Sequence, residues 1–297
     1  MDVKAHLIII DAHVHIHDCF NLTNFLDSAY ENCKAEICRL GKGDQFMGVL
    51  FLTETSRDHW FQRLVSYTDK KKTSSGNHTC QWSFHRTGEN NSLLAQSASG
   101  GELVLIAGRQ IVTKENLEVL ALATDSVFND GVSIRDAIEI VRERGAIPVI
   151  PWGFGKWWGR RGKVLTEVLQ SQKGTNLFLG DTSSRPGFLP YPTHFKQAKK
   201  QGMRILSGSD PLPLASEFWR PCSIGFSVIG LIEKDTPATD LKRILRDPTS
   251  VFSPYNASRE NWYRFFSNQV GMQLIKAHVR NDGLKMKAIR PGGPQPK

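Results

Sequence analysis

The stretch that decides the fold is HLIIIDAHVHIH, residues 6–17, close to the amino end of the chain. Its first half is apolar and rich in β-branched residues, which predicts a short buried strand. Alternate side chains of an extended strand point the same way. We therefore expect Asp11 to share one strand face with three imidazoles, those of His13, His15 and His17.

A strand face with three imidazoles and a carboxylate is poor core material, because each buried polar atom needs a partner. A divalent cation would be one such partner. Histidine and carboxylate ligands suit Zn, Mn or Fe, and such sites activate bound water near neutral pH. The competing interpretation is a strand end that emerges into solvent, where histidine needs no metal. We favour the metal site because the cluster directly follows an apolar strand.

Beyond this strand, short apolar runs alternate with segments of helical spacing. Further strands are predicted at 47–52, 103–112, 117–123, 146–150, 176–179 and 204–206, with helices at 22–37, 58–67, 133–144, 165–172, 193–201, 236–247 and 260–278. Strands separated by helices imply a mainly parallel sheet. No glycine-rich nucleotide turn follows the first strand, so a closed or nearly closed (β/α) barrel is favoured over an open doubly wound sheet.

Composition predicts an ordinary globular protein: 297 residues, 40% apolar and 23% charged. We expect one domain over residues 1–285, with a small insertion near 70–100 and a flexible tail at 286–297. No apolar run is long enough to cross a bilayer, and no secretory signal opens the chain, so the expected location is the cytoplasm. Five cysteines without a C-x-x-C pair indicate reduced thiols.

Polar residues follow several of the predicted strands. In a parallel barrel these strand ends converge on one mouth, where active sites lie. The candidates are Glu54, Gln110, Asp125, Trp152, Asp181 and Asp210. We favour Asp210, which ends the run Ser-Gly-Ser-Asp directly after an apolar strand, and place Asp181 second.

Residues 7–15, LIIIDAHVH, resemble the first motif of metal-dependent hydrolases of the PHP (polymerase and histidinol phosphatase) and amidohydrolase groups. Residues 145–150 and 207–210 are similar to two later PHP motifs, and 108–111 stand where PHP proteins have Gly-x-Glu. The order of the four segments favours PHP over amidohydrolase. The resemblance implies an α/β fold with a distorted (β/α)7-type (TIM-like) barrel, up to three metal ions, and phosphoester hydrolysis by metal-activated water.

The resemblance assigns metal binding to His13, His15 and Asp210. The chain departs from the PHP pattern in three places: Gln110 replaces the glutamate, Trp152 lies where a histidine is expected, and Leu212 replaces another histidine. A three-metal cluster is therefore excluded. We expect one or two ions at most, or none, with substitute ligands drawn from His17, Asp181, Glu54 and Glu118.

The loop WGFGKWWGRRGK, residues 152–163, is neither a P-loop nor a dinucleotide fingerprint. Its cations could hold an anion while its indoles stack on a ring. The residues predicted to bind substrate are Lys156, Arg160, Arg161, Arg185, Gln110 and Trp152. The alternative is that the tryptophans pack on the barrel and the cations are solvated. A net charge of +9 is consistent with an anionic ligand.

These observations predict a PHP-like metal-dependent hydrolase, of the phosphoesterase type, that acts on an anionic small molecule. The alternative is a catalytically degenerate barrel that binds an anionic ligand or partner through residues 152–163. We do not expect nucleic acid as a partner, because no helix-turn-helix, zinc-finger or RRM signature is present and the cations are dispersed. A membrane is not expected either, and the oligomeric state stays open.

Overall fold

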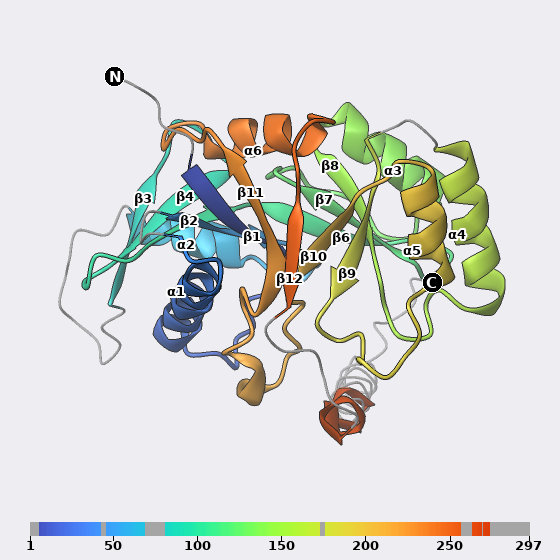
Figure 1. Ribbon diagram of the computed structural model, residues 1–297, viewed down its shortest axis with the longest axis horizontal. Coiled ribbons are helices and arrows are strands. Elements are labelled where there is room, and N and C mark those ends of the chain that lie inside the picture. The colour runs from blue at the N-terminus through green and yellow to red at the C-terminus, as the bar shows by residue number, and fades with distance from the viewer. Residues whose placement is uncertain are drawn as a thin grey trace, which may run out of the picture.

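The computed structural model describes residues 6–42, 46–68, 81–172, 176–256, 263–268 and 270–273. Helices separate many of the strands in this part of the chain, whereas five consecutive strands between residues 82 and 122 have no helix between them (Figure 1). The strands are β1 (His6–Val14), β2 (Phe46–Leu52), β3 (Trp82–Arg86), β4 (Ser92–Ser97), β5 (Glu102–Ile106), β6 (Gly108–Val112), β7 (Glu118–Leu122), β8 (Ile147–Pro151), β9 (Phe178–Thr182), β10 (Ile205–Gly208), β11 (Ile224–Gly230) and β12 (Ser253–Asn256). The helices are α1 (Leu22–Arg39), α2 (Trp60–Thr68), α3 (Ile134–Glu143), α4 (Gly159–Ser171), α5 (Thr193–Lys200) and α6 (Pro237–Arg246), with a 3-10 turn η1 (Ala215–Glu217). The α/β class is confirmed.

The strands form two mixed sheets. One has seven strands in the order β12-β11-β1-β2-β5-β4-β3, and the other has five in the order β10-β9-β8-β7-β6. Strands β1, β2 and β5 run parallel, as do β8, β9 and β10, while the remaining ladders are antiparallel. Neither sheet closes on itself, so the predicted (β/α)7-type barrel is wrong.

The physical reason lies at Ala107, between β5 and β6. Strand β5 extends the parallel ladder of β2, with Leu105 opposite Leu50. Strand β6 instead pairs antiparallel with β7, with Gln110 opposite Leu120. The segment predicted as one strand, 103–112, therefore changes sheet in its middle. A hairpin at this point interrupts the regular parallel order that a (β/α) barrel requires.

Alternate side chains of β1 belong to two separate cores. Ile8 and Ile10 pack with Val149 and Leu206 in a cluster that joins the two sheets. Ile9 belongs to a second cluster, beneath α1. A third cluster lies beneath α3, α4 and α5, on the outer face of the five-stranded sheet. Both faces of β1 are thus buried, which explains its nearly continuous apolar sequence.

The helix predicted to start at Ser133 is confirmed, because Ser133 Oγ accepts the N–H of Asp136 at 3.1 Å. Gly145 follows α3 with φ +68°, a left-handed conformation that glycine adopts readily. No helix in the described ranges has the length and apolar character needed to span a membrane.

Part of the predicted insertion near residues 70–100 lies outside the described residues, namely 69–80. Its described part forms β3 and β4, which extend the seven-stranded sheet in antiparallel fashion. The predicted tail at 286–297 also lies outside the described residues, and the predicted helix at 260–278 is described only in part.

The two sheets approach each other closely where the end of β10 passes β1. A Cβ atom on Gly208 would lie 2.4 Å from the backbone nitrogen of His13 and 2.5 Å from its Cβ. The N–H of Asp210 donates to the carbonyl of His13 at 2.7 Å. Glycine is required at position 208 by this contact, which brings residues far apart in sequence to one place.

We expect Gly208→Ala to lower the free energy of unfolding by about 1–3 kcal/mol, because the added methyl group forces the backbones apart. Chemical denaturation measures the change. The matched control is Gly187→Ala, where an added Cβ meets no atom within 4 Å. Equal stability of the two variants would contradict the close approach of β10 and β1.

Candidate metal centre

A bulge in β1 decides where its polar side chains point. The register of β1 against β2 shifts between Asp11 and Val14. Beyond the shift, Val14 and Ile16 pack in the cluster beneath α1. Alternation then places His13 and His15 on the opposite face, toward the space between the sheets. The prediction that Asp11 shares their face is wrong, because alternation holds only within an unbulged strand.

Asp11 is fully buried, and its carboxylate accepts three backbone N–H groups. Oδ1 accepts from His13 at 3.2 Å and from Ser209 at 2.8 Å, and Oδ2 accepts from Cys222 at 2.8 Å. Burial raises the pKa of Asp11 to about 7, although these hydrogen bonds act in the opposite direction. Cys222 and Asp210 both have left-handed φ angles, +59° and +48°, which non-glycine residues keep only where neighbouring contacts hold them.

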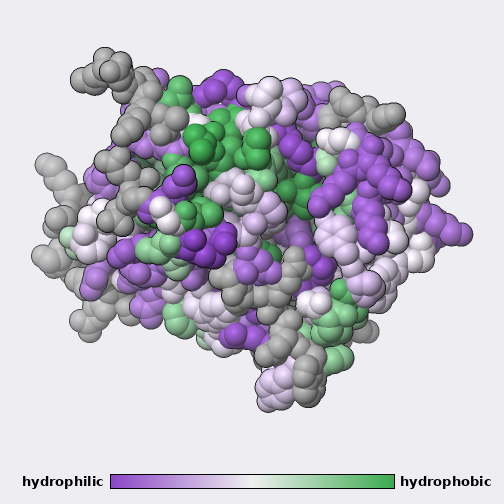
Figure 2. Space-filling view, viewed as in Figure 1, coloured by the Kyte–Doolittle hydropathy of each residue, from purple (hydrophilic) through white to green (hydrophobic). Residues whose placement is uncertain are grey.

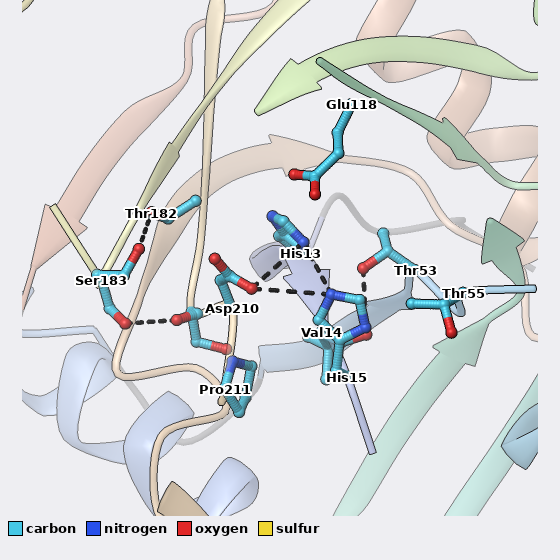
Figure 3. A network of polar contacts seen from close by, with 12 residues as sticks. His13, Val14, His15, Thr53, Thr55, Glu118, Thr182, Ser183, Asp210 and Pro211 are labelled. Carbon is cyan, nitrogen blue, oxygen red and sulfur yellow. Dashed lines mark hydrogen bonds and ion pairs between the residues drawn. The ribbon is translucent and has the colours of Figure 1, made fainter. Parts of the chain in front are cut away.

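Three potential metal ligands, from His13, His15 and Asp210, converge on one point, as Figure 3 shows. The Nε2 atoms of His13 and His15 are 3.0 Å apart. The Oδ1 atom of Asp210 lies 3.5 Å from the first and 3.7 Å from the second. Both histidines are buried, and Asp210 is partly exposed. The predicted grouping of His13, His15 and Asp210 is thus present in the structure.

The spacing of these atoms fits a small divalent cation. Neighbouring ligands of a tetrahedral zinc are about 3.3–3.5 Å apart, which follows from metal–ligand bonds of about 2.0–2.1 Å. The three observed separations, 3.0, 3.5 and 3.7 Å, bracket that range. The group could therefore hold a metal, with a fourth position free of these three residues.

The protonation state of His15 suits metal binding. Burial, together with the neighbouring His13 and His17, lowers the pKa of His15 well below its usual range, so its imidazole stays neutral. Neutral imidazole is the ligand form of histidine. Among the described residues, His13 Nδ1 is buried without a hydrogen-bond partner. Figure 3 shows the carboxylate of Glu118 extending from β7 toward this ring.

Two residues predicted as ligands lie outside the group. The Nε2–H of His17 donates to the carbonyl of Pro211 at 3.0 Å, which occupies that nitrogen. Asp181 forms a bidentate ion pair with Arg185, with both N–O distances at 2.7 Å. On β9, Asp181 shares the face of Leu179, which packs beneath the helices of the five-stranded sheet. Strand alternation thus directs Asp181 away from the space between the sheets.

Two residues predicted to bind substrate lie close to the metal group. The side chain of Gln110, on β6, hydrogen-bonds with His15. Lys156 pairs with Glu118, and its positive charge contributes to the lowered pKa of His15. Glu54, another proposed substitute ligand, instead pairs with Arg109 at 3.1 Å.

The other members of the predicted substrate set are spread around this region. Trp152 is buried in the core beneath α3, α4 and α5. Arg161 donates to the carbonyl of Gly155 at 2.8 Å, while Arg160 is exposed on the first turn of α4. The guanidinium of Arg185 is buried and engaged by Asp181.

A buried arginine network supports the end of β10, and no signal in the sequence indicated it. Arg220 is fully buried, pairs with Glu217, and donates to Ser183 Oγ at 3.0 Å. Ser183 Oγ in turn donates to the carbonyl of Ser209, the residue before Asp210. The network depends on residues that meet only in the folded chain, so local sequence patterns could not reveal it.

The raised pKa of Asp11 predicts a pH dependence of stability. Unfolding releases the side chain to its unperturbed pKa of 3.8, so between about pH 4 and 7 the folded state binds more protons than the unfolded state. The free energy of unfolding of the wild type, minus that of Asp11→Asn, should fall as pH rises through this window and level off above it. Denaturant titrations in the presence of a chelator measure this difference. A difference that stays constant or rises with pH would contradict the raised pKa.

No protein-family model matches the chain, and no curated protein matches its sequence. Among solved structures, the chain is similar to PsfC from Pseudomonas syringae PB-5123, with 11% identity and a TM-score of 0.53 over 91% of this chain and 99% of that one. It is also similar to the lesion-specific endonuclease PfuEndoQ from Pyrococcus furiosus, with 10% identity and a TM-score of 0.49 over 84% of this chain and 57% of that one.

A third similar structure is an endonuclease Q complex with a 27-mer duplex substrate that carries an abasic lesion at the active site. Its identity is 12% and its TM-score 0.44, over 82% of this chain and 57% of that one. Two of these similar chains are endonucleases, and one of them is bound to a duplex. The prediction that excluded nucleic acid as a partner is therefore corrected. The likeness to PsfC shows a shared fold.

Proposed function

We propose that the chain is a PHP-like metal-dependent hydrolase that acts on an anionic ester, most simply a phosphoester. The observation that carries the proposal is the convergence of His13 Nε2, His15 Nε2 and Asp210 Oδ1 at separations that suit one divalent cation. When bound there, such a cation would supply Lewis acidity and lower the pKa of a water molecule. We assign metal binding to His13, His15 and Asp210, and leave His17 and Asp181 as supporting residues.

The residues around the group favour an anionic substrate. Lys156 extends toward the histidines, close enough for its charge to lower the pKa of His15. Gln110 offers an amide beside the same imidazole, where it can donate to a substrate oxygen as well as orient the ring. Arg160 and Arg161 stand farther along the same segment, on the first turn of α4. We assign Lys156 and Gln110 to substrate contact, and the two arginines to attraction of its charge.

The second candidate function is binding without turnover. Gln110, a neutral side chain, touches His15, and Asp181 is committed to Arg185. Both observations reduce the number of carboxylates that could hold a second ion. A chain with this arrangement could bind an anionic ligand through residues 152–163 and leave it unchanged. Ligand-induced thermal stabilisation without product would then be observed.

The metal assignment predicts one equivalent of Zn, Mn or Fe in the purified protein by elemental analysis. His13→Ala together with His15→Ala should abolish binding, because two of three ligands are lost. A chelator should lower the melting temperature of the wild type but not of this double variant, since the bound ion stabilises only the folded state. His85→Ala, which removes an exposed histidine on β3, is the matched control. A metal-free wild type whose melting temperature equals that of the double variant would end the proposal.

Turnover of phosphomonoesters and phosphodiesters should depend on Lys156. Lys156→Gln is expected to raise KM about 10-fold or more, because a charge-assisted contact contributes about 1.5–3 kcal/mol. Asp210→Asn should remove turnover altogether. Lys234→Gln is the control, since Lys234 also pairs with a glutamate, Glu102, but at the amino end of β5, whereas the metal group lies at the carboxyl ends of β1 and β10. Ligand binding that persists without any turnover in the metal-loaded wild type would favour the second candidate.

A further inference from the structure

Four exposed aromatic rings form one connected surface, which we call the aromatic rim: Phe154, Trp158, Phe188 and Phe266. Their exposed fractions are 43%, 55%, 54% and 57%. They are joined through Phe265, which is buried and lies 4.9 Å from Phe154, 6.0 Å from Phe188 and 5.5 Å from Phe266 between ring centroids. Trp158 joins through Phe154 at 5.1 Å. Exposed rings gathered in this way mark an interaction surface.

The rings meet one another edge to face, which leaves flat ring surfaces available. The interplanar angles are 70° for Phe154 with Trp158, 71° for Phe154 with Phe265, and 83° for Phe188 with Phe265. In such an arrangement one ring contributes only its edge to the contact. The rim can therefore stack a planar group without losing its own packing.

The segments that build the rim are cationic. Residues 152–163, 183–191 and 263–268 contain no aspartate or glutamate, and their basic residues are Lys156, Arg160, Arg161, Lys163, Arg185 and Arg264. Arg160 and Lys163 are exposed on the first turns of α4. The guanidinium of Arg264 lies over the Trp219 ring at 4.6 Å, with 42% of its side chain exposed. Aromatic rings interleaved with cations suit a ligand that alternates planar groups with negative charges.

The two rim loops, residues 152–163 and 183–191, also contact residues beside the candidate metal centre. Two residues before Trp158, Lys156 pairs with Glu118 and acts on His15. Five residues before Phe188, Ser183 donates to the carbonyl that precedes Asp210. These loops follow the carboxyl ends of β8 and β9, and Figure 2 shows a small group of hydrophobic side chains at the lower right of the molecule.

From these features we infer that the aromatic rim binds the unpaired bases of a single-stranded nucleic acid, with its phosphates on the surrounding cations. A strand supplies both a ring to stack and a phosphodiester to present to the metal centre. A lipid surface supplies the negative charge but no planar group, so the rim favours the strand. Hydrolysis of the bound strand at the metal centre rests on the proposed function, whereas binding of the strand to the rim requires no metal.

The test is fluorescence anisotropy with labelled oligonucleotides of about 12 nucleotides, thymidine deoxyribonucleotides and uridine ribonucleotides in separate arms, in the presence of a chelator. Trp158→Ala should weaken binding about 5-fold or more, since each stacked base contributes strongly, and Trp158→Phe should retain most of it. Arg160→Gln should reduce the slope of log K against log salt by about 0.7. Ile229→Ala, an exposed apolar truncation on β11, should change nothing.

Three results would overturn the inference. The first is undetectable binding of both oligonucleotides, or binding unaffected by Trp158→Ala in a variant whose thermal melt matches the wild type. The second is equal competition by inorganic polyphosphate of the same charge, which would show that no base is stacked. The third is Trp158-dependent sedimentation with phosphatidylserine vesicles without oligonucleotide binding, which would assign the rim to a membrane. If His13→Ala still binds the strand and the wild type contains no metal, the proposed hydrolase function is contradicted while the inference about the aromatic rim is supported.

Discussion

The carboxylate of Asp11 is the constraint on which the geometry of the candidate metal centre depends. It lies in a fully buried position and accepts N–H groups from three segments: the bulge of β1, the end of β10 and the start of the run into β11. Each of those N–H groups would otherwise be buried without an acceptor. The carboxylate fixes the path of β10, and with it Asp210, which takes a left-handed φ at the point where it turns toward His13 and His15. A single side chain, placed outside the ligand set, thus holds ligands that lie almost 200 residues apart in sequence.

Residue type indicated the ligand set, whereas nonlocal contacts determined its geometry. His13, His15 and Asp210 could be selected from the sequence because imidazoles and a carboxylate after apolar strands are poor core material. The same argument selected His17 and Asp181, which found a carbonyl and a guanidinium instead. Asp11 was placed on the wrong face because a bulge leaves no mark in the alternation of polar and apolar residues. The hydrogen-bond or ion-pair partner of each polar atom is determined by chain segments that meet only after folding.

The fold, like the candidate site, could be predicted in its local features but not in its nonlocal contacts. Apolar periodicity located most strands and helices, and the capping residue Ser133 located the start of α3. The pairing and order of the strands could not be predicted from local sequence patterns. The apolar run 103–112 reads as one strand, yet Ala107 divides it between two sheets, and β6 turns antiparallel to β7. Periodicity reports which residues are buried but not which partner strand buries them, so a barrel and two open sheets give the same pattern.

The electrostatic balance of the metal centre connects the unusual Gln110 with the cationic loops. Burial keeps the His15 imidazole neutral, and the carboxylate of Glu118 is matched by Lys156. Among the described residues of the group, Asp210 then carries the one negative charge that no cationic side chain matches. The two positive charges of a divalent cation would exceed this single negative charge. A glutamate at position 110 would cancel that excess, whereas the glutamine leaves it uncompensated. With a cation bound, the proposed centre would carry a net positive charge like that of the cations around the aromatic rim, and glutamine at position 110 would thus favour an anionic ligand.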